Sequence, residues 1–217
     1  MGAEALGIYS RSFQALTMPT NLLGAAAEKV LFPTMTSIQG EQDRLARGVR
    51  IAIAALAMVS LPMSAFLMIL APEIVDIMLG SQWHAVIIPF QILSIGIVFR
   101  VGYKIFQSVA QAKGAVYQLA WRQWIYAVLV FIGAWGGHFW GLPGVALGVT
   151  MAIIISYLLV FELVARLADV SWFDVSKTMA RHGLITVFIG VTVWMIVNQA
   201  RAHIYNSLVV LALGAIS

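Results

Sequence analysis

Charged and amide side chains lie inside apolar segments of this chain, at spacings that put them on one face of a helix. In residues 6–38, all the strongly polar side chains fall within an arc of about 100° on a helical wheel, and they are Arg11, Gln14, Asn21, Glu28 and Lys29. Lipid cannot solvate such a face, so it must look toward protein or water. Two interpretations stay open: the arc lines a polar cavity, or its charges reach the headgroups while its amides bond neighbouring helices.

A second polar face follows further along the chain. Arg100, Lys104, Gln107 and Gln111 are spaced i, i+4, i+7 and i+11, which places them on one side of a helix. Like charges one turn apart repel each other, and residues 85–108 contain no acidic residue to offset them. The pattern predicts that these cations either reach the inner headgroups or present a cationic patch to an anionic ligand.

The remaining polar residues favour no catalytic or metal chemistry. The four histidines have no metal-ligand spacing, and cysteine is absent. We find no phosphate loop, no Ser/His/Asp set and no paired catalytic carboxylates, so we predict no enzyme, no metal and no cofactor. Glu162 is either a proton-coupling carboxylate or an interfacial one. No run of five like charges exists to bind nucleic acid.

Composition indicates that the elements positioning these residues are membrane helices. Hydrophobic residues make up 61% of the chain, charged residues only 10%, and the mean hydropathy is +0.92, whereas soluble domains hold about 25% charged residues. A bilayer crossing needs about 20 mostly apolar residues. Residues 1–217 therefore predict a single all-α transmembrane domain, a polytopic bundle in the lipid bilayer. We expect about seven spans, at 6–38, 49–71, 85–108, 117–136, 141–165, 183–199 and 204–217.

Prolines and loop charges add hinges and an orientation. Pro19, Pro33 and Pro62 lie inside spans, where proline removes a backbone donor and favours a kink that could act as a hinge. Nearly all loop Lys and Arg lie in or beside the first, third and fifth connections. Because basic residues stay on the cytoplasmic side, we expect loops 39–48, 109–116 and 166–182 to be cytoplasmic and the N-terminus of this chain to be outside.

Two connections predict short surface helices. Residues 72–83 place Ile74, Ile77 and Met78 on one face and acidic residues on another, which favours an external interfacial helix that Gly80 ends. Ser171 can cap a helix along the inner surface within residues 169–182. The chain has no signal peptide and stops within an apolar run, so we expect it to be part of a longer membrane protein.

Several motifs occur in a recognisable order. They are Gly7-Ile8-Tyr9-Ser10-Arg11, the mid-helix Pro19, Phe32-Pro33-Thr34-Met35-Thr36-Ser37, the Gly80 to Trp83 segment, and Pro89 to Arg100. The ordered set closely resembles the second half of bacterial polysaccharide (O-antigen) flippases, members of the multidrug/oligosaccharidyl-lipid/polysaccharide exporter superfamily. The resemblance extends to about residue 165.

This resemblance implies a fold and a function. The fold would be two pseudo-symmetric helical bundles around a central cavity, and this chain would be the C-terminal bundle without its N-terminal partner. The function would be alternating-access export of an undecaprenyl-pyrophosphate-linked glycan across the bacterial cytoplasmic (inner) membrane, for lipopolysaccharide or exopolysaccharide synthesis. Basic cavity residues of the family bind the anionic carrier, which suits Arg11 and Arg100.

Other functions stay open. A drug or cation exporter of the same superfamily would need membrane carboxylates, and here Arg and Lys outnumber Glu28 and Glu162 within the spans. A glycan polymerase or ligase would need a large external loop bearing catalytic groups, whereas the predicted external connections are short. A non-transporting, truncated membrane remnant is the remaining alternative.

Overall fold

The computed structural model describes residues 7, 10, 21, 24, 25 and 28–203, and all regular structure among them is helical. Residues 28–37 form a helix. The elements that follow are α2 (Gln42–Ile69), α3 (Ala71–Met78), the 3₁₀ turn η1 (Ser81–Val86), α4 (Ile87–Ala112), α5 (Val116–Gly137), η2 (His138–Trp140), α6 (Gly141–Ala168) and α7 (Trp172–His203). The predicted all-α fold is confirmed.

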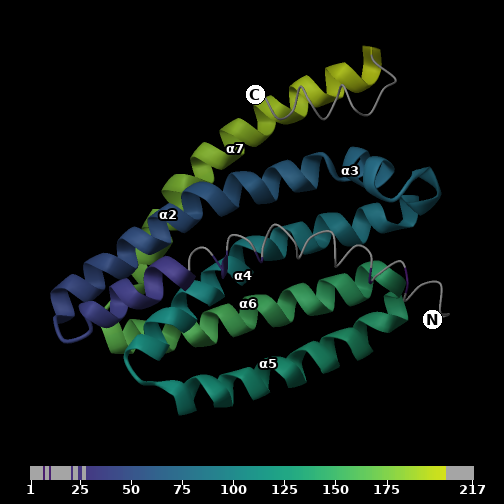
Figure 1. The fold of residues 1–217 in the computed structure, drawn as a ribbon. Coiled ribbons are helices and arrows are strands. Elements are labelled where there is room, and N and C mark those ends of the chain that lie inside the picture. The colour runs from purple at the N-terminus through teal and green to yellow at the C-terminus, as the bar shows by residue number, and fades with distance from the viewer. Residues whose placement is uncertain (1–6, 8–9, 11–20, 22–23, 26–27, 204–217) are drawn as a thin grey trace.

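The long helices pack as a row of neighbours. In Figure 1 they lie in the order α7, α2, α4, α6 and α5, and each packs mainly on the helices beside it. Four stretches of the described chain are long and apolar enough to cross a membrane: Gln42–Ile69, Gln82–Ala112, Val116–Ala168 and Val175–Gln199. The third stretch holds both α5 and α6, which turn back on each other at η2. Five of the predicted spans therefore correspond to long helices.

The first and last predicted spans lie mostly or wholly outside the described residues. Most of 6–38 and all of 204–217 lie outside the described residues, and Pro33 lies within the helical part that is described. The separate inner-surface helix predicted in residues 169–182 is wrong, because α7 runs unbroken from Trp172 to His203. Ser171 does cap its start, accepting the N–H of Phe173 at 3.1 Å. No glycine or proline follows before Gly183, so nothing ends the helix there.

The short helix predicted within residues 72–83 is confirmed as α3, Ala71–Met78, and its external position stays a prediction. It ends at Met78, and Gly80 follows with a φ of 93°, which favours glycine. One of its acidic residues differs from the expectation of a polar face, because Glu73 is buried.

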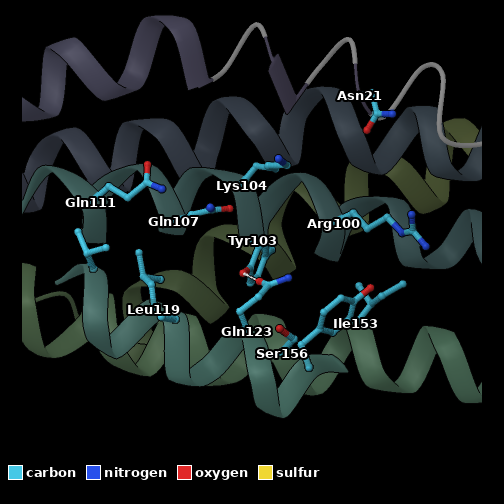
Figure 2. Close-up of a pocket in the computed structure, with 13 residues that line it drawn as sticks. Asn21, Arg100, Tyr103, Lys104, Gln107, Gln111, Leu119, Gln123, Ile153 and Ser156 are labelled. Carbon is cyan, nitrogen blue, oxygen red and sulfur yellow. Dashed lines mark hydrogen bonds between the residues drawn. The ribbon is translucent and has the colours of Figure 1, made fainter. Parts of the chain in front are cut away.

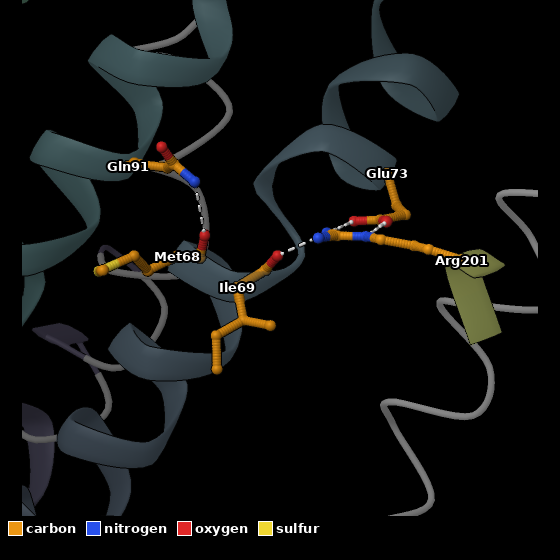
Figure 3. Close-up of polar contacts among 5 residues, drawn as sticks. All are labelled: Met68, Ile69, Glu73, Gln91 and Arg201. Carbon is orange, nitrogen blue, oxygen red and sulfur yellow. Dashed lines mark hydrogen bonds and ion pairs between the residues drawn. The ribbon is translucent and has the colours of Figure 1, made fainter. Parts of the chain in front are cut away.

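Polar contacts explain that burial and tie the end of α2 to two other helices. Figure 3 shows the Arg201 guanidinium facing the Glu73 carboxylate, with Nε–Oε1 at 2.6 Å and Nη2–Oε2 at 2.9 Å. The same Nη2 donates to the carbonyl of Ile69 at 3.0 Å, and Gln91 donates to the carbonyl of Met68 at 3.2 Å. Carbonyls at a helix C-terminus lack intrahelical partners, so these side chains cap α2 from α7 and α4.

Glycines bring α5 and α6 into backbone contact. A Cβ added at Gly137 would lie 2.3 Å from the carbonyl oxygen of Gly144, and one at Gly133 would lie 2.6 Å from that of Gly148. Small residues allow membrane helices to approach in this way. The α5 and α6 helices therefore pack closely as a hairpin, and α6 packs on α4, which places α5 opposite the polar face of α4.

Candidate functional site

A cavity of about 490 Å³ lies between α4, α5, α6 and Asn21 (Figure 2). Its polar lining comes from Asn21, from Arg100, Tyr103, Lys104, Gln107 and Gln111 on α4, from Gln123 and Tyr126 on α5, and from Ser156 on α6. Both polar faces predicted from the sequence therefore contribute residues to one cavity.

The sequence of α4 explains why its polar residues face the cavity. Tyr103 belongs to the same helical face as Arg100, Lys104, Gln107 and Gln111. The opposite face is apolar and buried in the core through Val98, Val101, Ile105 and Val109. Burial of that apolar face orients the helix, and the cations are thereby turned toward the cavity.

The far wall of the cavity is joined to α4 by a hydrogen bond. The Tyr103 hydroxyl donates to Oε1 of Gln123 at 2.5 Å, and Figure 2 shows the two side chains pointing toward each other. Sequence reasoning missed Tyr103, Gln123, Tyr126 and Ser156. The available signals were an amide inside the apolar segment 117–136 and a tyrosine one turn from a membrane arginine.

An ion pair joins the helix at residues 28–37 to Lys104 on the cavity wall. Oε2 of Glu28 lies 3.9 Å from Nζ of Lys104, and the two side chains are 40% and 45% exposed. A Cβ added at Gly24 would lie 3.4 Å from Cγ of Lys104, so Gly24 also lies beside α4. The predicted arc and the predicted α4 face thus meet at Lys104.

The other predicted site residues have these positions. Lys29 is exposed and is not part of the cavity lining. Arg11, Gln14 and Pro19 lie outside the described residues. Pro62 lies inside α2, which stays helical on both sides of it. Glu162 lies on α6, where its carboxylate pairs with Arg166 and does not line the cavity.

The cavity is suited to an anionic, oxygen-rich group. Two cations project into it, and an arginine guanidinium can bind a phosphate through two parallel hydrogen bonds. The amides and hydroxyls around them can bond additional oxygens. Within the part of the chain that the structure describes, no group of three or more His, Asp or Glu side chains could hold a metal ion.

Comparisons with known proteins find similarity to polysaccharide biosynthesis proteins. Residues 1–88 match the family model described as "Polysaccharide biosynthesis protein". The lipopolysaccharide biosynthesis protein WzxC of Escherichia coli (strain K12) is 26% identical over 169 residues, which are 76% of this chain and 34% of that protein. The chain is thus similar over part of its length to bacterial polysaccharide biosynthesis proteins. The resemblance inferred from the motifs is thereby confirmed. The region that matches the family model contains the motifs between Gly7 and Trp83.

Two further comparisons agree. The teichuronic acid biosynthesis protein TuaB of Bacillus subtilis (strain 168) is 30% identical over 133 residues, covering 61% of this chain and 27% of that protein. The solved structure of the lipid II flippase MurJ in an inward closed conformation has a TM-score of 0.77 at 14% identity, and covers 98% of this chain and 45% of that one. That likeness shows the fold. The chain spans about a third of the length of the curated relatives it matches.

Proposed function

We propose that this chain forms one lobe of a membrane flippase that moves a lipid-linked glycan precursor outward for cell-surface polysaccharide synthesis. Its relatives are named for lipopolysaccharide and teichuronic acid biosynthesis, and its fold is that of a lobe of a lipid II flippase. Because the chain spans only part of those proteins, we propose that a second lobe, N-terminal in the full protein, forms the opposite wall of the cavity.

The observation that carries this proposal is the cationic wall of α4. Charged side chains within a membrane bundle are costly and mark ligand pathways. Arg100 and Lys104 lie one turn apart and face the same cavity. A diphosphate group, as in an undecaprenyl-pyrophosphate-linked glycan, offsets their mutual repulsion and binds each cation through charge-assisted hydrogen bonds.

The charge bias of the loops supports an orientation for transport. Under the positive-inside rule the ends of α4 and α5 that meet near Lys113 are cytoplasmic. Arg100, Lys104 and Gln111 then lie in the inner half of the bilayer, where the headgroup of the precursor enters. Pro19, Pro33 and Pro62 are proposed hinges, at which the first segment and α2 bend as the lobes alternate access.

Ligand binding tests the proposal. Removing one charge-assisted bond costs about 1.5–3 kcal/mol, which corresponds to about a tenfold loss of affinity or more. Arg100→Gln and Lys104→Gln should each weaken binding of undecaprenyl pyrophosphate to the chain in lipid nanodiscs by at least about tenfold. Arg166→Gln is the matched control, because Arg166 is outside the cavity and mostly exposed.

Two results would contradict the proposal. Wild-type affinity in both cavity variants would exclude the α4 face as the anion site. Preferential binding of a lipophilic cation such as tetraphenylphosphonium would instead favour a drug exporter of the same superfamily.

A further inference from the structure

The Glu28–Lys104 contact is an acid–base pair on the wall of the cavity. Its partners belong to different segments. Lys104 lines the cavity, whereas Glu28, on the helix at residues 28–37, is not part of the lining and places its carboxylate beside Nζ of Lys104. Resting on the proposed function, we propose that Glu28 is a resident counter-ion. Its carboxylate pairs with Lys104 in the empty cavity and is displaced by the phosphate oxygens of the substrate.

The geometry of the pair suits an exchangeable contact. The N–O distance is 3.9 Å, and the side chains are 40% and 45% exposed. Ion pairs between accessible partners contribute little to stability, so a ligand with more than one negative charge can replace the carboxylate. The Glu73–Arg201 pair differs in distance and in the burial of its carboxylate, because its bonds are short and the Glu73 side chain is only 7% exposed.

A carboxylate beside Lys104 reduces the like-charge repulsion on this face of α4. Lys104 and Arg100 are like charges at i, i+4 on the same face, and such pairs destabilise a helix. Glu28 offsets that repulsion while no ligand is bound. When a bound phosphate group neutralises the charge of Lys104, the electrostatic attraction that holds Glu28 beside α4 is lost.

Substrate binding would therefore release the Glu28 end of the helix at residues 28–37 and leave the rest of that helix attached. Met35, further along the helix at 28–37, is buried, and its Cε lies 3.2 Å from the position of a Cβ at Gly48 of α2. This packing involves no charge, so an anion does not weaken it. The occupancy of the cavity would thus control how closely Glu28 approaches α4.

A double-mutant cycle with inorganic pyrophosphate tests the proposal on the full chain in nanodiscs. Calorimetry would compare the wild type with Glu28→Gln, Lys104→Gln and the double variant. Because a pair of exposed charges is worth at most about fivefold in affinity, Glu28→Gln should tighten pyrophosphate binding by roughly two- to fivefold. In the Lys104→Gln background the same change should have a clearly smaller effect.

Controls separate this role from general charge effects. Glu162→Gln also removes one negative charge, but from a pair outside the cavity, and should leave pyrophosphate affinity unchanged. Glu28→Asp keeps the charge and shortens the side chain by one methylene, so its affinity should lie between those of the wild type and Glu28→Gln. Circular dichroism establishes that each variant retains its helical content.

The outcomes are distinguishable. Unchanged or weakened binding in Glu28→Gln, with Lys104→Gln weakened as expected, overturns the counter-ion role and leaves the proposed function intact. Equal tightening with and without Lys104 also overturns it, because Glu28 would then act through its field alone. Absence of pyrophosphate binding by the wild type and by Glu28→Gln would overturn the proposed function itself.

Discussion

Replacing Gly137 by alanine should force α5 and α6 apart at the η2 end of their hairpin. The new Cβ would lie 2.3 Å from the carbonyl oxygen of Gly144 and 2.5 Å from its carbon. Ordinary van der Waals contact of a Cβ begins at 3.4 Å, so the two backbones must separate by about 1 Å. The obstructing atoms are backbone, so no side-chain rotation relieves the clash.

The free-energy cost follows from two opposing effects. Overpacking a tight contact costs about 1–3 kcal/mol, and replacing glycine by alanine within a helix returns about 0.5–1 kcal/mol. Gly137→Ala should therefore lower the free energy of unfolding by up to about 2.5 kcal/mol, and relative to a glycine-to-alanine change without the contact by about 1–3 kcal/mol. Gly144→Ala meets the same contact from the other helix, at 2.2 Å from the Gly137 oxygen, so the double variant should cost less than the sum of the single ones.

The neighbouring glycine provides a matched control. Gly136 lies on the same helix, and a Cβ there would have nothing within 4 Å. Both substitutions add one methyl group with the same helix propensity, so the difference between them reports the interhelical contact. Unfolding in mixed micelles with increasing sodium dodecyl sulfate, followed by circular dichroism, measures it. Identical midpoints for Gly137→Ala and Gly136→Ala would refute the close approach of α5 and α6.

Three further changes should destabilise the fold in the same assay. Glu73→Ala should cost about 3 kcal/mol, because it leaves Arg201 without its carboxylate in a partly buried position; Arg201→Lys keeps the charge but loses the two-point geometry, and should cost less. Gly102→Ala should cost about 1–3 kcal/mol, since its Cβ would lie 2.5 Å from the ring of Tyr157; the additional change Tyr157→Leu should recover most of it. Ser64→Ala should cost about 0.5–1.5 kcal/mol, because the Ser64 hydroxyl donates to a carbonyl of α4 at 2.7 Å in a buried position.

Hydropathy was sufficient to predict the long helices, because a segment that crosses a bilayer must be apolar and must satisfy its own backbone. It was not sufficient to find where α7 begins. Residues 172–182 are polar enough to be interpreted as a surface segment, yet they contain no residue that breaks a helix. A change in polarity does not by itself end a helix, so the polar turns at residues 172–182 and the apolar residues after them form one helix, α7.

The site was predictable in parts. The polar face of α4 follows from spacing alone, since Arg100 and Lys104 must share a side of any helix that contains them. The contact between Lys104 and Glu28 depends on how separate segments pack against each other. Residue spacing within one segment cannot predict that packing. The same limit hid Tyr103 and Gln123, whose hydrogen bond joins α4 to α5.

The Arg201–Glu73 pair has a consequence for the order in which the bundle is assembled. Its partners are 128 positions apart, so the ribosome completes Glu73 long before Arg201. During that interval the carboxylate has no guanidinium, and a lone charge does not enter an apolar environment. Until α7 arrives, α3 should therefore stay at the membrane surface, with the last carbonyl of α2 exposed to water. Docking of α7 is then a late step of biogenesis, and it completes the end of a helix that was synthesised much earlier.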